Sequence, residues 1–174
     1  MNIPIEYNNK IDEFSKDLTL QMRLENYIKK HFDIAYIISN YCQIYLLGGA
    51  IRDLIYANKP KDMDFVILGK ENMDFVLNIF KIYNIDYSIN KLGGFKFNYN
   101  NTEIDLWLSD DLFSSIQYNV DGLFFDLKTN SLLSFSFEDF INNGLKVINN
   151  ENNIDNGREK KLIKFEEKFK KNIH

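Results

Sequence analysis

The sequence predicts an α+β fold, and three observations support this prediction. An apolar run at 44–47 leads through two glycines into a helical pattern, residues 62–65 alternate between acidic and apolar side chains, and two further strand patterns flank a turn at 100–101. Alternation with a period of two is typical of half-buried strands, and paired asparagines between such strands are typical of a β-hairpin. Helical patterns separate these strands along the chain, so helices are expected to cover the sheet.

Helical patterns occupy the stretches before, between and after the strands. Apolar residues recur in them at the three- and four-residue spacing of amphipathic helices. The expected elements are helices at 11–32, 34–41, 71–83 and 158–171 and a short strand at 87–90. Their apolar positions include Phe14, Leu18, Met22 and Tyr27 in the first helix and Leu162, Phe165, Phe169 and Ile173 in the last. The expected regions are an N-terminal helical region at 1–42, a central domain at 43–148, and a polar linker with a C-terminal helix at 149–174.

Composition narrows the class of protein. The 174 residues, of which 45% are hydrophobic, are enough for one substantial core. A net charge of −4 argues against a broadly basic surface, so RNA would have to use a local patch. Two patches are visible: the stretch 91–96, and the lysine-rich helix at 158–171, which a packed helix with a solvated charged face also explains.

Cysteine and histidine are scarce. The single cysteine, Cys42, excludes a disulfide within the chain, and the two histidines leave no zinc site. No apolar run is long enough to span a bilayer, and residues 1–6 lack the basic and apolar regions of a signal peptide. We therefore expect a cytoplasmic protein without membrane contact.

Asp62 and Asp64 lie one residue apart at the start of an apolar strand. Side chains alternate between the faces of a strand, so both carboxylates point one way while Met63 and Phe65 point the other. Adjacent carboxylates repel each other, and a shared cation relieves the repulsion. Hard oxygen ligands favour Mg²⁺ or Mn²⁺, although a bare Asp-x-Asp is also common at solvated strand ends.

Gly48 and Gly49 precede these aspartates, between the run at 44–47 and a helical stretch that contains Arg52. A glycine pair lets backbone N–H groups approach an anion closely, and the start of the helix adds the positive end of its dipole. Arginine offers a fork of donors that suits phosphate. The combination of glycines and carboxylates indicates phosphate chemistry with a metal ion.

Both halves of this pattern resemble the head domain of the bacterial poly(A) polymerase and CCA-adding tRNA nucleotidyltransferase family. That family's pattern runs Gly-Gly-x-Val-Arg-Asp and then Asp-x-Asp-Phe, which residues 48–53 and 62–65 match in the same order. The resemblance implies a polymerase-beta-like nucleotidyltransferase palm, with a mixed or antiparallel sheet and helices packed on one face. It also implies that Asp62 and Asp64 bind Mg²⁺ or Mn²⁺. The nucleotide-binding residues it implies are Gly48, Gly49, Arg52, Asp53 and Lys61.

A third carboxylate is expected on the second strand of the hairpin. The strand pattern at 103–108 places Glu103 and Asp105 on one face and Ile104 and Leu106 on the other. An aspartate between aliphatic residues is usual at this position in the superfamily that the chain resembles, which favours Asp105 and keeps Glu103 as the alternative. The resemblance implies a two-metal in-line displacement on an NTP.

The sequence departs from the family after residue 114. Residues 115–126 align without a gap with a family segment that begins Arg-Arg-Asp, but those positions are here Ser115, Ile116 and Gln117. The missing arginines remove charge-assisted hydrogen bonds worth about 1.5–3 kcal/mol each, so weak ATP binding or a different donor is expected. The resemblance covers 43–148 without the family's base-reading neck, so CCA synthesis by this chain alone is not expected.

The sequence thus predicts a nucleotidyltransferase that moves a nucleoside monophosphate from an NTP to a hydroxyl. The expected acceptor is an RNA or tRNA-like 3′ end, with a protein hydroxyl as the other choice. Two alternatives stay open: a pseudoenzyme that binds a nucleotide or a partner, and a component of a toxin–antitoxin or phage-defence pair. The apolar stripe of the C-terminal helix is a candidate surface for a partner protein.

Overall fold

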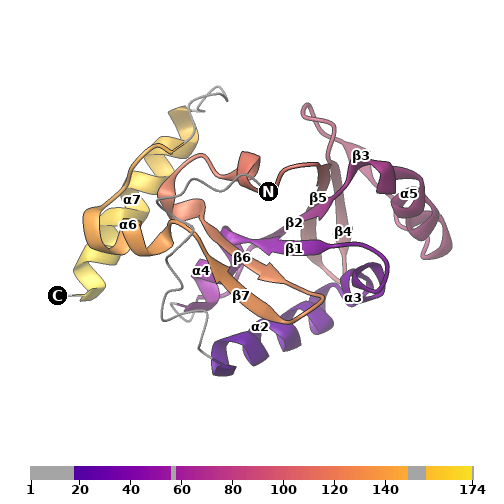
Figure 1. The fold of residues 1–174 in the computed structure, drawn as a ribbon, viewed down its shortest axis with the longest axis horizontal. Coiled ribbons are helices and arrows are strands. Elements are labelled where there is room, and N and C mark those ends of the chain that lie inside the picture. The colour runs from indigo at the N-terminus through magenta and orange to yellow at the C-terminus, as the bar shows by residue number, and fades with distance from the viewer. Residues whose placement is uncertain (1–17, 56–57, 149–155, 174) are drawn as a thin grey trace.

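The computed structural model describes residues 18–55, 58–148 and 156–173, with a seven-stranded mixed sheet at the centre (Figure 1). The strand order is β3-β4-β5-β2-β1-β6-β7, and all neighbours in this sheet are antiparallel except β2 and β5, which are parallel. The strands are β1 (Ile44–Leu47), β2 (Asp62–Leu68), β3 (Ser88–Ile89), β4 (Phe95–Tyr99), β5 (Thr102–Ser109), β6 (Leu123–Asp126) and β7 (Ser131–Ser134). The predicted α+β class and mixed sheet are confirmed.

Helices and short 3₁₀ turns connect and cover the strands. The helices are α2 (Leu18–His31), α3 (Ile34–Ser39), α4 (Gly48–Ile55), α5 (Met73–Ile82), α6 (Phe137–Asn143) and α7 (Asn156–Ile173). The 3₁₀ turns are η2 (Lys70–Asn72), η3 (Phe113–Ser115) and η4 (Asn119–Asp121). The helices expected at 34–41 and 71–83 are confirmed, whereas residues 11–17 of the first expected helix lie outside the described part. Among the described helices, none is long and apolar enough to cross a membrane.

Strands β4 and β5 form the predicted hairpin. Its two-residue turn consists of Asn100 and Asn101, whose φ angles are 48° and 61°. Type I′ hairpin turns need positive φ at both central residues, and asparagine adopts that conformation more readily than other non-glycine residues. The turn fixes the register of the two strands, so that Lys96 lies opposite Asp105.

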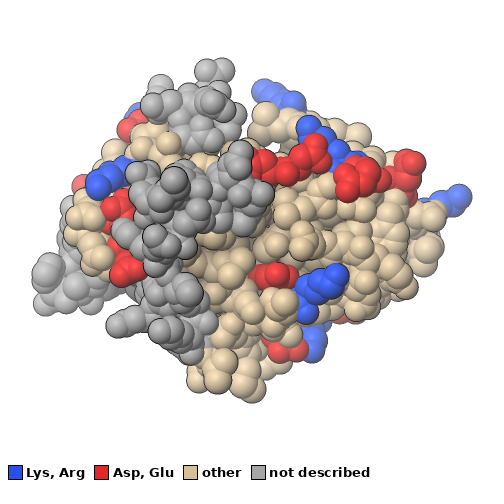
Figure 2. Space-filling model, viewed as in Figure 1, with Lys and Arg blue, Asp and Glu red and all other residues tan. Residues whose placement is uncertain are grey.

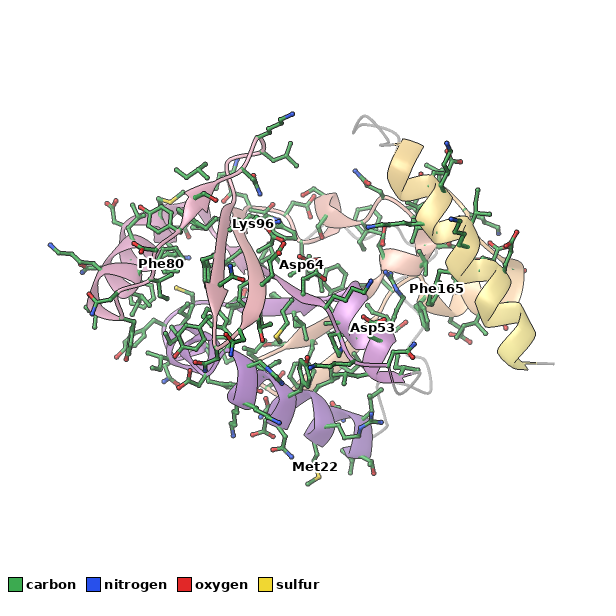
Figure 3. All side chains as sticks on the ribbon, turned by 180° about the vertical axis from the view of Figure 1, so that it is seen from behind. Met22, Asp53, Asp64, Phe80, Lys96 and Phe165 are labelled. Carbon is green, nitrogen blue, oxygen red and sulfur yellow. The ribbon has the colours of Figure 1, made fainter. Side chains whose placement is uncertain are left out.

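One face of the sheet carries the main hydrophobic core, and helix α2 packs on it. Its buried residues are Leu20, Leu24 and Ile28, at four-residue spacing. The expected inward positions Leu18 and Met22 are instead 72% and 62% exposed, and Met22 points away from the sheet (Figure 3). These two apolar residues therefore lie outside the stripe of α2 that packs on the sheet.

A smaller hydrophobic cluster covers part of the opposite face. Tyr45, Val66 and Phe124 come from three neighbouring strands and pack against Leu112 and Ile116 of the segment after β5. This irregular segment, with its turn η3, covers part of the second face of the sheet. The alternation of side chains along the strands does not by itself reveal that this part is buried. The acidic side chains that β2 and β5 place on this face therefore lie at one end of each strand, at Asp62, Asp64, Glu103 and Asp105.

The C-terminal helix α7 lies beside α6 (Figure 1). Leu162 is buried in the main core, and the ring centre of Phe165 lies 5.9 Å from that of Phe140 on α6. These apolar side chains therefore pack on the chain itself, as the interpretation of a packed terminal helix predicted. Nothing in the described part of the chain supports the alternative that they contact a partner protein. The side chains of Phe169 and Ile173 lie outside the described part.

Candidate functional site

Two rows of side chains cross neighbouring strands on the second face of the sheet. In the first row Asp64 of β2 pairs with Asp105 of β5, which pairs with Lys96 of β4. In the next row Asp62 pairs with Glu103. Strands lie about 4.8 Å apart, so directly paired side chains on one face are neighbours. The backbone register therefore brings the predicted carboxylates together.

These acidic side chains differ in their exposure to solvent. Asp62 is exposed, whereas Asp64 and Asp105 are half-buried. Burial raises the pKa of the Asp105 carboxyl, the charge of Lys96 opposes that rise, and the charges of Glu103 and Asp62 add to it. Figure 2 shows acidic side chains gathered, with a few basic ones, over the part of the molecule that carries β3 to β5. Such a concentration of negative charge favours the binding of a cation.

Lys96 brings a positive charge to this face. The sequence analysis expected it only in the stretch 91–96 as a candidate contact for RNA, not as a partner of the carboxylates. Nζ of Lys96 forms an ion pair with Oε1 of Glu103, and the hydrogen bond to Glu103 and the charge of Asp105 raise the pKa of Lys96. Figure 3 shows Lys96 on the same side of the molecule as Asp64. A two-residue turn at 100–101 already implies that Lys96 lies opposite Asp105, so the sequence contained the signal.

The donor set fits a hard divalent cation in its chemistry and its backbone positions. Carboxylate oxygens are the ligands that Mg²⁺ and Mn²⁺ prefer, and Asp62, Asp64 and Asp105 share one face of adjacent strands. Within residues 18–55, 58–148 and 156–173, no three His, Cys, Asp or Glu side chains are arranged as a complete metal site. Rotation of the carboxylates between staggered rotamers, without a change of register, is the adjustment that binding would require.

Gly48 and Gly49 begin helix α4 directly after β1. They were expected in a turn between the strand and the helix, but both lie in the first turn of α4 and neither has a positive φ. Strand β1 ends one residue beyond the pair of Leu46 with Phe65, so α4 starts beside the Asp64 end of β2. The first N–H groups of a helix lack intrahelical partners and can bind an anion. Here Gly48 is buried and Gly49 is half-buried.

Arg52 ties α4 to the segment before β6. Its Nη1 donates to the carbonyl oxygen of Val120 at 3.0 Å and lies 3.4 Å from Oδ1 of Asp121. Its guanidinium carbon lies 5.3 Å from the centre of the Phe165 ring. These contacts hold the helix that carries the glycines in place, and a contact between Arg52 and phosphate stays a prediction.

The other two residues expected at the nucleotide lie on different elements. Lys61 is exposed and directly precedes Asp62 at the start of β2. Asp53 is half-buried on α4, apart from Asp64 in Figure 3. Burial raises the pKa of Tyr27 on α2, and the charge of Asp53 adds to that rise. Lys61 is therefore adjacent in sequence to the first carboxylate of β2, whereas Asp53 lies near Tyr27 of helix α2.

The segment that departs from the family pattern forms a turn against the second face of the sheet. Ile116 is fully buried in the smaller cluster. Oγ of Ser115 donates to the carbonyl oxygen of Leu112 at 2.7 Å, and the carbonyl oxygen of Gln117 accepts from the amide of Ile148 at 2.8 Å. Residues 115–117 thus carry no charge to a ligand, and the burial of Ile116 is incompatible with an arginine there.

A polar network that the sequence analysis missed supports this segment. Nδ2 of Asn119 donates to Oδ2 of Asp139 at 2.9 Å, and Oγ of Ser136 donates to the carbonyl oxygen of Asn119 at 2.7 Å. Burial alone would raise the pKa of Asp139. Hydrogen bonds from Asn119 and Asn143, together with nearby Lys146, outweigh burial and hold that pKa below its ordinary value. No periodic pattern marks these residues, because they are brought together only by the fold.

An open depression of about 420 Å³ adjoins the carboxylates on the side of β3 and β4. Its lining residues are Asp86, Tyr87, Ser88, Lys96, Phe97, Asn98 and Glu103. Lys96 and Glu103 belong both to this depression and to the two rows of charged side chains. A ligand bound here would therefore lie next to Asp105, on the side away from α4.

Comparison with known proteins shows that this chain is similar in fold to solved structures. No family model and no curated protein matches the sequence. A CCA-adding enzyme in complex with ATP has a TM-score of 0.53, over 78% of this chain and 36% of that chain. The complex with CTP gives 0.54 over 75% and 36%, and the Thermotoga maritima CCA-adding enzyme complexed with tRNA gives 0.53 over 86% and 37%. Sequence identity is 16% in all three comparisons.

These similarities define the class of fold. The chain spans little more than a third of the length of those enzymes, 36% to 37%. Its mixed sheet and covering helices match their nucleotidyltransferase fold, and the acidic strand pair lies within that sheet. The chain therefore has the polymerase-beta-like nucleotidyltransferase fold that the sequence predicted.

Proposed function

We propose that this chain is a metal-dependent nucleotidyltransferase, which moves a nucleoside monophosphate from an NTP to a hydroxyl acceptor. The observation that carries this proposal is the register of β2 on β5, which sets Asp64 beside Asp105 at the end of the sheet where α4 begins. A cation site and an anion site would then adjoin, as phosphoryl-group chemistry requires. The nucleotidyltransferase fold supports the proposal.

Each part of the site has its own role in this proposal. Backbone N–H groups of Gly48 and Gly49 would bind phosphate, helped by the positive end of α4. Lys61, exposed beside Asp62, would add a positive charge there. The three aspartates would hold Mg²⁺ or Mn²⁺, whose contribution is to activate the attacking hydroxyl and to offset charge on the leaving pyrophosphate. No protein nucleophile is needed.

For the acceptor, we propose the 3′ end of an RNA. One neighbour in fold is a CCA-adding enzyme complexed with tRNA, which supports this choice by analogy. Lys91 in the β3–β4 connection and Lys96 of β4, which lines the depression, would contact an RNA backbone. A protein hydroxyl is the alternative acceptor.

A transfer assay with radiolabelled NTPs tests both the reaction and the acceptor. The purified chain is incubated with each α-labelled NTP, Mg²⁺ or Mn²⁺, and total cellular RNA or protein. The Asp62→Asn/Asp64→Asn variant removes the charges at nearly constant size, and Asp110→Asn is the matched control at an exposed aspartate after β5. We expect labelled RNA from the wild type and from Asp110→Asn only. Equal labelling by the double variant would refute the site, and label on protein alone would change the acceptor.

One observation favours a second candidate, a module that binds a nucleotide or a partner without catalysis. The turn at 115–117 brings no charged side chain to the site, and Ile116 is buried where the family pattern has an arginine. Such a module would bind an NTP at the start of α4 without transferring it. Nucleotide binding by wild-type protein that produces no labelled RNA or protein would favour this candidate.

A further inference from the structure

Strand β5 offers two carboxylates to the site, and each lies beside an aspartate of β2. Asp105 pairs with Asp64, and Glu103 pairs with Asp62, all on one face of the sheet. Either β5 residue therefore has the backbone position of a third metal ligand. Alternation along the strand does not distinguish them, because both side chains point the same way.

The contacts of Lys96 with these two carboxylates differ. It lies directly opposite Asp105 on β4, yet its ammonium group reaches diagonally to form an ion pair with Glu103. Diagonal neighbours on adjacent strands lie about 7–8 Å apart, a distance that a lysine side chain spans. Among the described residues, Asp105 takes part in no ion pair.

We propose that Lys96 is a positioning residue that selects the third carboxylate of the metal site. By binding Glu103, the lysine holds that side chain toward β4 and away from the aspartates of β2, so that Asp105, which is paired with Asp64, is the third ligand. The ion pair also neutralises the one acidic side chain on this face that the site does not use. An ion pair this exposed contributes little to folding. This inference rests on the proposed function.

Mn²⁺ binding to the full chain, measured by titration calorimetry without nucleotide, tests the selection. Asp105→Asn is expected to weaken binding about tenfold or more. Adding Lys96→Met should restore much of that loss, because Glu103 is then free to serve as the ligand. Adding Glu103→Gln as a third change should abolish the recovery. Lys96→Arg in place of Lys96→Met keeps the ion pair and should give no recovery.

Each possible result of this titration either supports or overturns the proposed role of Lys96. No recovery in Lys96→Met/Asp105→Asn, or recovery that persists after Glu103→Gln, would overturn the proposal, since the second result indicates an effect of charge alone. Lys91→Met, which removes a lysine from the same hairpin connection, is the matched control and should not restore binding. Thermal unfolding of each variant confirms that it is folded. Wild-type protein that binds no Mn²⁺ would overturn the proposed metal site together with this inference, whereas wild-type binding without recovery overturns the inference alone.

Discussion

Asp64 and Asp105 are paired residue for residue across the one parallel strand pair of the described sheet. They are 41 positions apart in the sequence, and helix α5 and strands β3 and β4 come between them. The parallel register places them side by side because the chain returns from β2 through α5, β3 and β4 before β5 begins. This single pairing joins the two acidic patterns of the sequence into one site.

The first prediction concerns Asp64. Asp64→Asn removes one charge from the paired carboxylates and should lower transfer by about 100-fold or more, at least the loss seen when outer-shell metal partners are mutated. Mg²⁺ or Mn²⁺ should raise the melting temperature of the wild type but not of the variant. Transfer kinetics and thermal unfolding with and without metal check both effects. A variant with the metal response of the wild type would remove Asp64 from the site.

The second prediction concerns acid stability. Because the pKa of Asp139 is depressed in the folded state, its ionised form stabilises the fold above the ordinary pKa near 3.9, and this stabilisation is lost as pH falls through the folded value. Asp139→Asn should therefore cost about 1–3 kcal/mol at pH 7. The difference from the wild type should shrink below about pH 4. Urea unfolding from pH 3 to 7 measures it, and a constant difference would contradict the assignment.

The third prediction concerns a close approach of two backbone segments. A Cβ at Gly122 would lie 1.9 Å from Oγ of Ser136 and 2.7 Å from its backbone nitrogen. Gly122→Ala should therefore displace the backbone and lower stability by about 1–3 kcal/mol or more. Gly49→Ala is the control, because its new Cβ meets no atom closer than 3.9 Å and alanine favours a helix. Denaturant midpoints that fall equally for both variants would be inconsistent with this steric explanation.

The fourth prediction concerns the departure from the family pattern. Ile116→Arg would bury a charge among the apolar side chains of the smaller cluster, which should cost about 3 kcal/mol or more. Ile116→Val, which keeps the site apolar, should cost about 0.5–1.5 kcal/mol. Chemical unfolding of the two variants distinguishes them. If the arginine variant is as stable as the valine variant, the turn at 115–117 is more open than the structure indicates.

Much of the fold and the main acidic residues were predictable from local pattern. Alternation around Met63 and Phe65 identified the buried face of β2, and Asn100-Asn101 identified the hairpin. The inward stripe of α2 was not identified from the sequence, because Leu18 and Met22 are apolar as well, and packing against the sheet buries Leu24 and leaves Met22 exposed. The network around Asn119 was equally hidden, since hydrogen-bonding partners distant in sequence leave no periodic signal.

The sequence by itself determined the strand and helix types, the two acidic strands and the glycines that begin α4, because backbone propensity and side-chain alternation are local properties. Only the tertiary structure decided which residues meet. It set Asp64 beside Asp105 and turned Lys96 to Glu103, and it buried Ile116 at a position where the family pattern has an arginine. Strand order and register produce these outcomes, since pairing between strands depends on how the whole hydrophobic core packs.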